Sequence, residues 1–303
     1  PQVGCDFKHK SQQCGSQGAV SADLIARALQ LEAERGGGGE VRTLKLKVVI
    51  AATDNGQAGQ ALATQPSKVQ AEIDVANEIF ARCNTGIQIQ LCGPIQVVED
   101  AGFYWSGDMQ SPTVQAAIEK GYITALYAYQ LSGNIGGYVI GELIGISSFA
   151  TPSTLAHEIG HVLGLSHTMD NIIEPELLDG SNCTIGGDML CDTPADPNLS
   201  LPDMVAPPCM YVGTITDANG DLYMPMLNNL MSYSPCTADS LTTQQGALMR
   251  FMVDSIFLHL RRTSAPSPLH HSTFGNAIMP VRYNWLQHQV PARSSDHSWM
   301  AAP

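Results

Sequence analysis

One string constrains this chain more than any other feature: HEIGHVLGLSH at residues 157–167. On a helix, residues four positions apart lie on one face, so His157 and His161 can present two imidazole nitrogens to one metal ion. Gly164 tolerates positive φ and can end the helix, so that the chain turns and brings His167 back to the same ion. Three histidines leave one position of a tetrahedral Zn²⁺ open, which is typical of a catalytic site rather than a structural one.

Glu158 lies next to the first predicted ligand and completes a catalytic arrangement. Its carboxylate can take a proton from the attacking water and pass it to the leaving amine, which makes Glu158 the candidate general base. We therefore predict a zinc-dependent endopeptidase. Two alternatives stay open: a zinc-binding protein without turnover, which would not need Glu158, or a zinc hydrolase of a non-peptide substrate.

The composition is that of a globular protein with enough apolar residues for a core. The chain has 303 residues, 44% of them hydrophobic, which suits one sizeable domain or two small ones. A formal net charge of −13 argues against nucleic acid or an anionic membrane surface as the main partner, so we expect a peptide or protein substrate. The apolar stretch 122–150 is interrupted by glycines and Glu142, and it predicts strands around a glycine turn and no membrane insertion.

The cysteines indicate the compartment. Eight occur, none in a CxxC pair, and disulfides explain them better than a metal cluster. Disulfides form in oxidising compartments, so we predict a secreted, extracellular protein. The sequence begins at Pro1 without a basic and apolar leader, and we expect any signal peptide to have been removed from it.

The order of the periodic segments predicts a mixed sheet with helices packed on it. Helices are predicted at residues 22–34, 67–81, 152–163 and 242–260, and strands at 41–51 and 87–91. The glycines at 36–39 are interpreted as a flexible joint. We divide the chain into three parts. The N-terminal segment (1–40) is a candidate pro-segment remnant, and the catalytic domain (41–263) has an upper subdomain to about residue 165 and a lower one after it. The tail (264–303) is predicted to be disordered because it lacks periodicity.

A second group of motifs carries a family resemblance. The segment NLMSYS at 229–234 resembles the Met-turn of the metzincins, in which a methionine underlies the three histidines. Together with CDTP at 191–194 and the loop cysteines Cys183, Cys209 and Cys236, it is similar to the pappalysin family of metzincin zinc metalloproteases. The resemblance covers about residues 41–262 and is strongest at the zinc helix.

The resemblance implies an α+β fold of the metzincin type. In this fold a mixed twisted sheet carries an active-site helix and a backing helix. An irregular C-terminal subdomain with the Met-turn and a final helix follows, and the cleft runs between the two parts. The family also implies that Met231 is the turn residue and that Tyr233 is a mobile phenol near the metal.

The chemistry of these two residues agrees with those roles. A phenol donates a hydrogen bond at neutral pH, so Tyr233 can stabilise the oxyanion of the tetrahedral intermediate; the alternative is an ordinary core tyrosine. The thioether of Met231 fills an irregular gap under the metal site, which is a structural role.

Acidic residues after the zinc helix predict a second metal. Asp188, Asp192 and the Thr193 carbonyl fall near the point where the family binds structural calcium, and oxygen atoms are the ligands that Ca²⁺ prefers. The competing interpretation is a solvated acidic loop.

The family's order of cysteines implies that Cys183 pairs with Cys209 and Cys191 with Cys236. A separate argument concerns Cys83 and Cys92, which lie on either side of the predicted strand 87–91. An extended strand rises about 3.3 Å per residue, so these two are too far apart to bond to each other.

Cys5 and Cys14 leave two arrangements open. One of them pairs with Cys83 or Cys92, or the two pair locally and Cys83 and Cys92 stay as buried thiols. Cys14-Gly15-Ser16 is similar to a Cys-Gly-Thr stretch ahead of the catalytic domain in many relatives, so Cys14 is also a candidate zinc ligand of a latent form.

Relatives that prefer a basic residue after the scissile bond carry an acidic residue soon after the Met-turn tyrosine. Here residues 234–236 are Ser, Pro and Cys, which leaves the cleavage preference open.

Overall fold

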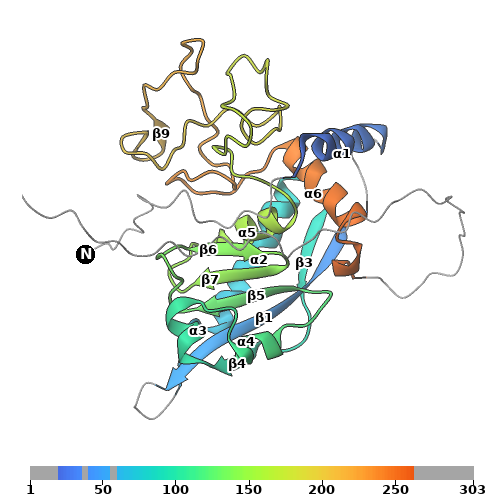
Figure 1. Ribbon diagram of the computed structural model, residues 1–303, viewed down its shortest axis with the longest axis vertical. Helices are drawn as coiled ribbons and strands as arrows, with labels where there is room; N and C mark the ends of the chain where they lie inside the picture. The colour runs from blue at the N-terminus through green and yellow to red at the C-terminus, as the bar shows by residue number, and fades with distance from the viewer. Residues whose placement is uncertain (1–19, 36–39, 55–59, 263–303) are drawn as a thin grey trace, which may run out of the picture. The chain divides into compact units, whose positions relative to one another are not determined.

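A computed structural model describes residues 20–35, 40–54 and 60–262. The chain divides into two compact units, residues 1–263 and 264–303. The predicted glycine joint, the predicted disordered tail, and Cys5 and Cys14 all lie outside the described residues. The first unit has the α+β architecture that the sequence predicts, with a mixed sheet and helices packed against it (Figure 1).

The sheet is built around one long strand, β1 (Arg42–Asp54). Its residues 48–52 are buried in an unbroken run, which is typical of a strand covered on both faces. The other strands are β2 (Gln60–Leu62), β3 (Ile87–Leu91), β4 (Gln96–Glu99), β5 (Ile123–Ala128), β6 (Gly137–Ile140) and β7 (Leu143–Ser147). β3, β4 and β5 pair with β1 in parallel, and β7 pairs with β5 in parallel. β2 pairs with β1 and β6 pairs with β7 in antiparallel fashion.

The strand order β2-β1-β5-β7-β6 puts β6 at one end of the sheet. The helix α5 (Thr154–Val162) contacts β6 and β7 on one side and α2 (Pro66–Arg82) on the other. α2 begins with Pro66, which fits the first helical position because its missing N–H has no partner there. Two short helices, α3 (Ala101–Ser106) and α4 (Pro112–Ala117), lie beside β1 and β4. The helices predicted at 67–81 and 152–163 are both confirmed.

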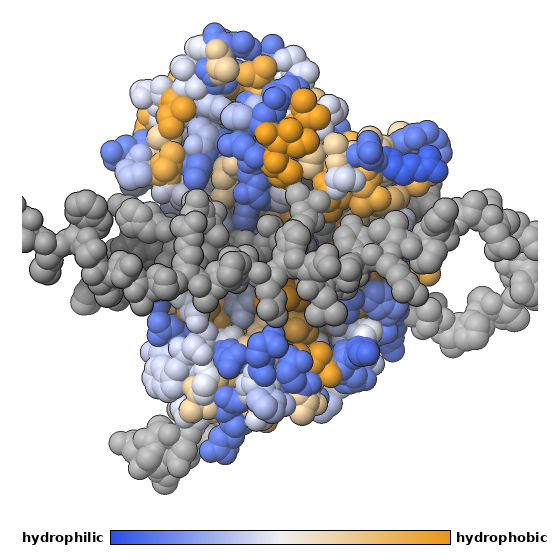
Figure 2. All heavy atoms as spheres, in the orientation of Figure 1, coloured by the Kyte–Doolittle hydropathy of each residue, from blue (hydrophilic) through white to orange (hydrophobic). Residues whose placement is uncertain are grey.

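After α5 the chain forms loops with two short strands, β8 (Val205–Ala206) and β9 (Met210–Tyr211), before the final helix α6 (Thr243–Ser255). These loops expose large hydrophobic side chains such as Leu222 and Met224, and Figure 2 shows hydrophobic groups among hydrophilic ones over this part of the visible face. This agrees with the predicted irregular C-terminal subdomain. No described helix is long and apolar enough to span a membrane.

The final helix is shorter than the predicted 242–260. α6 begins with a capping box, in which the Thr242 hydroxyl accepts from Gln245 N and the Gln245 side chain accepts from Thr242 N. It ends because the amides of Ile256 and Phe257 both donate to the Met252 carbonyl, and a short 3-10 turn at Leu258–Leu260 follows. Phe257 is buried there.

The N-terminal helix α1 (Ala22–Arg35) confirms the helix predicted at 22–34. It packs along α6 (Figure 1), with Ile25 and Ala28 buried. The predicted domain boundary after residue 40 therefore separates two segments that share one core in the structure.

Candidate active site

The three histidines converge at the C-terminal end of α5. Nε2 of His161 lies 3.1 Å from Nε2 of His157 and 3.0 Å from Nε2 of His167. The helix ends at Val162, and Gly164 then adopts φ +86°, a conformation that favours glycine. The predicted turn at Gly164 is thus confirmed, and it returns His167 to the other two rings. Among the described residues, these histidines are the one group with metal-ligand spacing.

Each imidazole is oriented by a partner on its other nitrogen. Nδ1 of His157 donates to the Leu230 carbonyl at 2.7 Å, and Nδ1 of His161 donates to the Leu165 carbonyl at 2.8 Å. Nδ1 of His167 lies 3.2 Å from Oδ2 of Asp170. With the proton on Nδ1, each Nε2 keeps its lone pair, and all three lone pairs face one point.

Burial keeps the rings of His157 and His161 neutral. Burial, followed by the nearby His167, lowers the pKa of His157 to about 3, and burial with both neighbouring histidines lowers the pKa of His161 well below its ordinary value. A neutral imidazole is the form that binds a metal. His157 and His161 are therefore in their ligating form at neutral pH.

Glu158 is buried, with 2% of its surface exposed, and it faces the end strand of the sheet. A Cβ added to Gly137 on β6 would lie 2.4 Å from Oε1 of Glu158. Only glycine at this position leaves room for the carboxylate.

The Met-turn lies under α5, as the resemblance implies. Met231 is fully buried, and a Cβ added to Gly160 on α5 would lie 2.7 Å from its sulfur. The turn is held by Asn229, whose Oδ1 accepts from Met231 N at 2.9 Å and whose Nδ2 donates to Gln245 on α6 at 3.0 Å. The glycine on the helix and the methionine on the turn therefore pack as a pair.

Tyr233 lies beside the histidines. Its ring centroid is 4.5 Å from that of His167 and 6.4 Å from that of His157, and its side chain is half-buried. The structure therefore brings the phenol to the same site as the three imidazoles and Glu158.

Two functional carboxylates were missed by sequence reasoning. Asp170 could have been predicted from the sequence, because a carboxylate three residues after the last histidine can reach back to the Nδ1 atom of that histidine. Asp196 could not have been predicted, because its partners are distant in sequence. Its Oδ2 accepts hydrogen bonds from the Thr168 hydroxyl at 2.6 Å and from the Ser232 hydroxyl at 2.8 Å. It thereby ties the segment after the third histidine to the Met-turn.

The three residues predicted to bind calcium lie in different environments. Asp188 is 2% exposed, and its Oδ2 has no hydrogen-bond partner among the described residues. Burial, with Glu176 and Asp192 nearby, raises the pKa of Asp188 well above its ordinary value. The carboxylate of Asp192 is exposed and accepts from Gln244 N at the start of α6, at 2.8 Å. Thr193 is buried.

The disulfide pairing implied by the resemblance is wrong in this structure. Cys183 bonds to Cys191, with 4.9 Å between Cα atoms, and Cys209 bonds to Cys236, with 5.8 Å. The loop between Cys183 and Cys191 doubles back through Gly187 and Met189, both at positive φ, and this brings its ends together. Spacing along the chain carries no information about such a local reversal.

Cys83 and Cys92 are free and half-buried, so the prediction that they do not bond to each other is confirmed. Cys83 accepts a hydrogen bond from Leu241 N at 3.2 Å. The predicted role of Cys14 in latency lies outside the described residues.

Comparisons with known proteins agree with this geometry. The model of the peptidase M43 family, described as pregnancy-associated plasma protein-A, matches residues 137–254. An extracellular metalloprotease of Pyricularia oryzae is 27% identical over 221 residues, which cover 62% of this chain and 72% of that protein.

Two solved structures share the fold. Mirolysin in complex with compound 9 matches with a TM-score of 0.53 and 17% identity, over 74% of this chain and 97% of that chain. A promirolysin mutant of Tannerella forsythia matches with a TM-score of 0.53 and 15% identity, over 82% of this chain and 97% of that chain. The family match spans β6, the zinc helix, the Met-turn and nearly all of α6, so it contains every residue of the histidine site. Residues 137–254 are therefore similar to the peptidase M43 family, the pappalysins, and the chain is similar to an extracellular metalloprotease.

Proposed function

We propose that this protein is a secreted zinc endopeptidase in which Glu158 is the general base. The single observation that carries the proposal is the convergence of three Nε2 atoms, each oriented by a partner on its Nδ1, beside a buried glutamate. Three imidazoles suit Zn²⁺, which supplies Lewis-acid activation of water and of the scissile carbonyl when it is bound. His157, His161 and His167 would hold it.

The chain's own residues supply the proton transfers and the positioning. Glu158 takes the proton of the attacking water and returns it to the leaving amine. The Tyr233 phenol donates a hydrogen bond to the oxyanion as charge develops there. Met231 and Asp196 hold the Met-turn and the segment after His167 in place, and neither needs to touch the substrate.

The two alternatives make different demands. A zinc-binding protein without turnover has no use for a buried glutamate packed against Gly137. A hydrolase of non-peptide substrates would share the site, but the family match and the Pyricularia oryzae relative are both of proteases, which supports peptide hydrolysis. Secretion is supported by the two disulfides and by the extracellular relative.

Calcium binding is the second part of the proposal. The buried Oδ2 of Asp188 has no hydrogen-bond partner among the described residues, and Glu176 nearby is only 7% exposed. A buried ionised carboxylate is costly without a cation, and two together are costlier. Glu176 also lines a cavity of about 260 Å³. Asp188 and Glu176 would provide oxygen ligands, whereas Asp192 is already engaged at the start of α6.

The decisive experiment is incubation of the purified protein with a diverse peptide mixture, followed by mass spectrometry of the new termini. We expect cleavage that a chelator abolishes and that added zinc restores. The Glu158→Gln variant serves as the matched control for a contaminating protease. Equal cleavage by parent and variant, or none by the zinc-loaded parent, would contradict the proposal.

A further inference from the structure

We propose that α1 is a docked, permanent part of the enzyme that buttresses the zinc-binding turn, and that a cut in the glycine stretch 36–39 does not release it. The docking part is independent of the function proposed above. The effect on zinc rests on that function. The proposal differs from a removable pro-segment, which would leave after such a cut.

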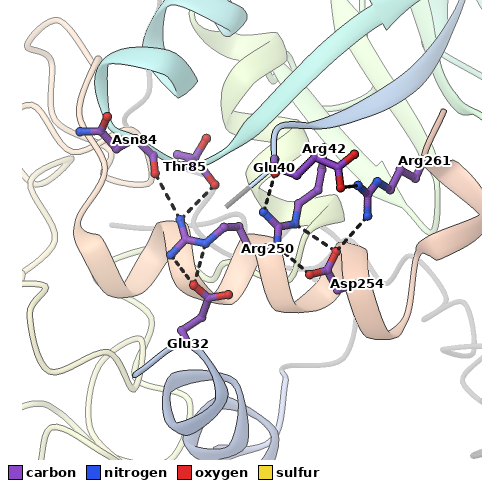
Figure 3. Close-up of polar contacts among 8 residues, drawn as sticks. All are labelled: Glu32, Glu40, Arg42, Asn84, Thr85, Arg250, Asp254 and Arg261. Atoms are coloured by element: carbon purple, nitrogen blue, oxygen red, sulfur yellow. Dashed lines mark hydrogen bonds and ion pairs between the residues drawn. The ribbon is translucent and has the colours of Figure 1, made fainter. Parts of the chain in front are cut away.

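A buried ion pair connects α1 to α6. Nε and Nη2 of Arg250 each lie 2.8 Å from Oε2 of Glu32, and the two side chains are 8% and 10% exposed (Figure 3). The remaining donor, Nη1, bonds to the carbonyls of Asn84 and Thr85. Separating this pair is costly, because removing Glu32 leaves the charge of the Arg250 guanidinium buried without its partner.

The apolar face of α1 packs on the same surface. Ile25 and Ala28 are buried, and the half-buried side chains of Leu24, Leu29 and Leu31 contact the core. An isolated helix of this length is marginal in water, so α1 depends on this contact for its structure. The outer face carries polar side chains such as Arg27 and Glu34.

The chain returns to α6 directly after the glycine stretch. Nε and Nη2 of Arg42 bond to the two carboxylate oxygens of Asp254 on α6 at 3.0 and 2.7 Å. Arg261 reaches both Asp254 and Glu40 (Figure 3). Helix α6 therefore holds the chain on both sides of residues 36–39, so the covalent link is not needed to keep α1 in place.

Val20, two residues before the start of α1, touches the turn at Gly164. A Cβ added to Gly164 would lie 3.0 Å from Cγ2 of Val20 and 3.2 Å from Cγ of Met252 on α6. Gly164 lies between the second and third histidines and has φ +86°. The turn that delivers His167 is therefore packed between Val20, two residues before α1, and α6, the helix on which α1 docks. This makes Val20 a positioning residue.

The docking is tested with the full-length protein carrying a site for a sequence-specific protease in place of residues 36–39. After complete cleavage, we expect residues 1–35 to co-elute with the rest of the chain on gel filtration. The Glu32→Gln variant should dissociate at least about tenfold more readily, and the matched Glu34→Gln variant, exposed on the same helix, should behave like the parent. If the cut parent releases its N-terminal fragment, the docking is refuted, whatever the variants do.

The positioning role is tested by the rate of zinc release to a chelator. Val20→Ala should release zinc roughly threefold faster or more, as loss of support around a metal site does. The control is Leu31→Ala, which removes a comparable contact of α1 away from Gly164. Faster release in Val20→Ala alone supports the role. Equal release rates in both variants, once corrected for their thermal stabilities, overturn it and leave the docking result unaffected.

Discussion

Gly137 and Glu158 are packed so closely that a residue with a side chain cannot replace Gly137 unless the carboxylate moves. A Cβ on Gly137 would lie 2.4 Å from Oε1 and 2.9 Å from Cδ of the carboxylate. Because β6 is fixed by its pairing with β7, the glutamate side chain would have to move instead. The end strand of the sheet therefore helps to set the position of the candidate base.

We expect Gly137→Ala to lower kcat by about 100-fold, because displacing a catalytic group by about 1 Å costs that much. Zinc content should stay at the parent level, since none of the histidines is touched. The neighbouring Gly136→Ala is the control: its added Cβ meets only Thr154 Oγ1, at 4.0 Å. Parent-like kcat in Gly137→Ala would contradict the assigned role of the strand.

Glu158→Gln should retain zinc and lose proteolysis by several orders of magnitude, because an amide cannot accept the proton of the attacking water. Metal analysis and steady-state kinetics on the same preparation separate the two effects. Turnover equal to that of the parent would remove Glu158 from the mechanism.

Asp170→Asn should weaken zinc binding by about 10-fold to 100-fold, because the amide orients His167 less strongly than the carboxylate does. Competition with a chromogenic chelator measures the affinity. The exposed Asp74→Asn on α2 makes the same chemical change far from the site and should leave the affinity unchanged. Equal affinities in all three proteins would count against the hydrogen bond to His167.

Burial raises the pKa of Glu176 from 4.5 to about 7, so the calcium-free fold binds a proton there that the unfolded chain has already released. Stability should therefore fall as the pH rises between these values, by about 3 kcal/mol at most from this group, with Asp188 adding in the same direction. Denaturant titrations at several pH values measure this. Calcium should reverse the loss, because it binds the ionised carboxylates.

The variant Glu176→Gln should remove the part of this pH dependence that Glu176 contributes and should weaken the response to calcium. Glu78→Gln, at an exposed position of α2, should change neither. A calcium response that persists unchanged in Glu176→Gln would place the ion elsewhere.

Peptide mapping without reduction should recover Cys183 linked to Cys191 and Cys209 linked to Cys236. The longer of the two loops should stabilise more: the double replacement Cys209→Ser with Cys236→Ser should cost on the order of 3 kcal/mol of unfolding free energy in a chain-entropy view. Peptides joining Cys183 to Cys209 would show instead that the family order holds.

The sequence was sufficient to predict a feature wherever the residues that form it are close along the chain. The spacing from His157 to His167 determines both the helix face and the turn at Gly164, because helix geometry and glycine's tolerance of positive φ are local properties. The strands predicted at 41–51 and 87–91 and the helix predicted at 67–81 were found for a similar reason, since burial follows their periodicity. The Met-turn needed a family resemblance as well, because its contact with Gly160 spans about seventy residues of chain.

The tertiary structure decided what depends on non-local approach. Asp196 became a link between two active-site segments only because the loops bring Thr168 and Ser232 to it. The disulfide pairs and the docking of Glu32 on Arg250 likewise follow from which segments meet in space. Periodicity and spacing report the faces of single elements, whereas these contacts arise from packing between elements, and no local pattern encodes that packing.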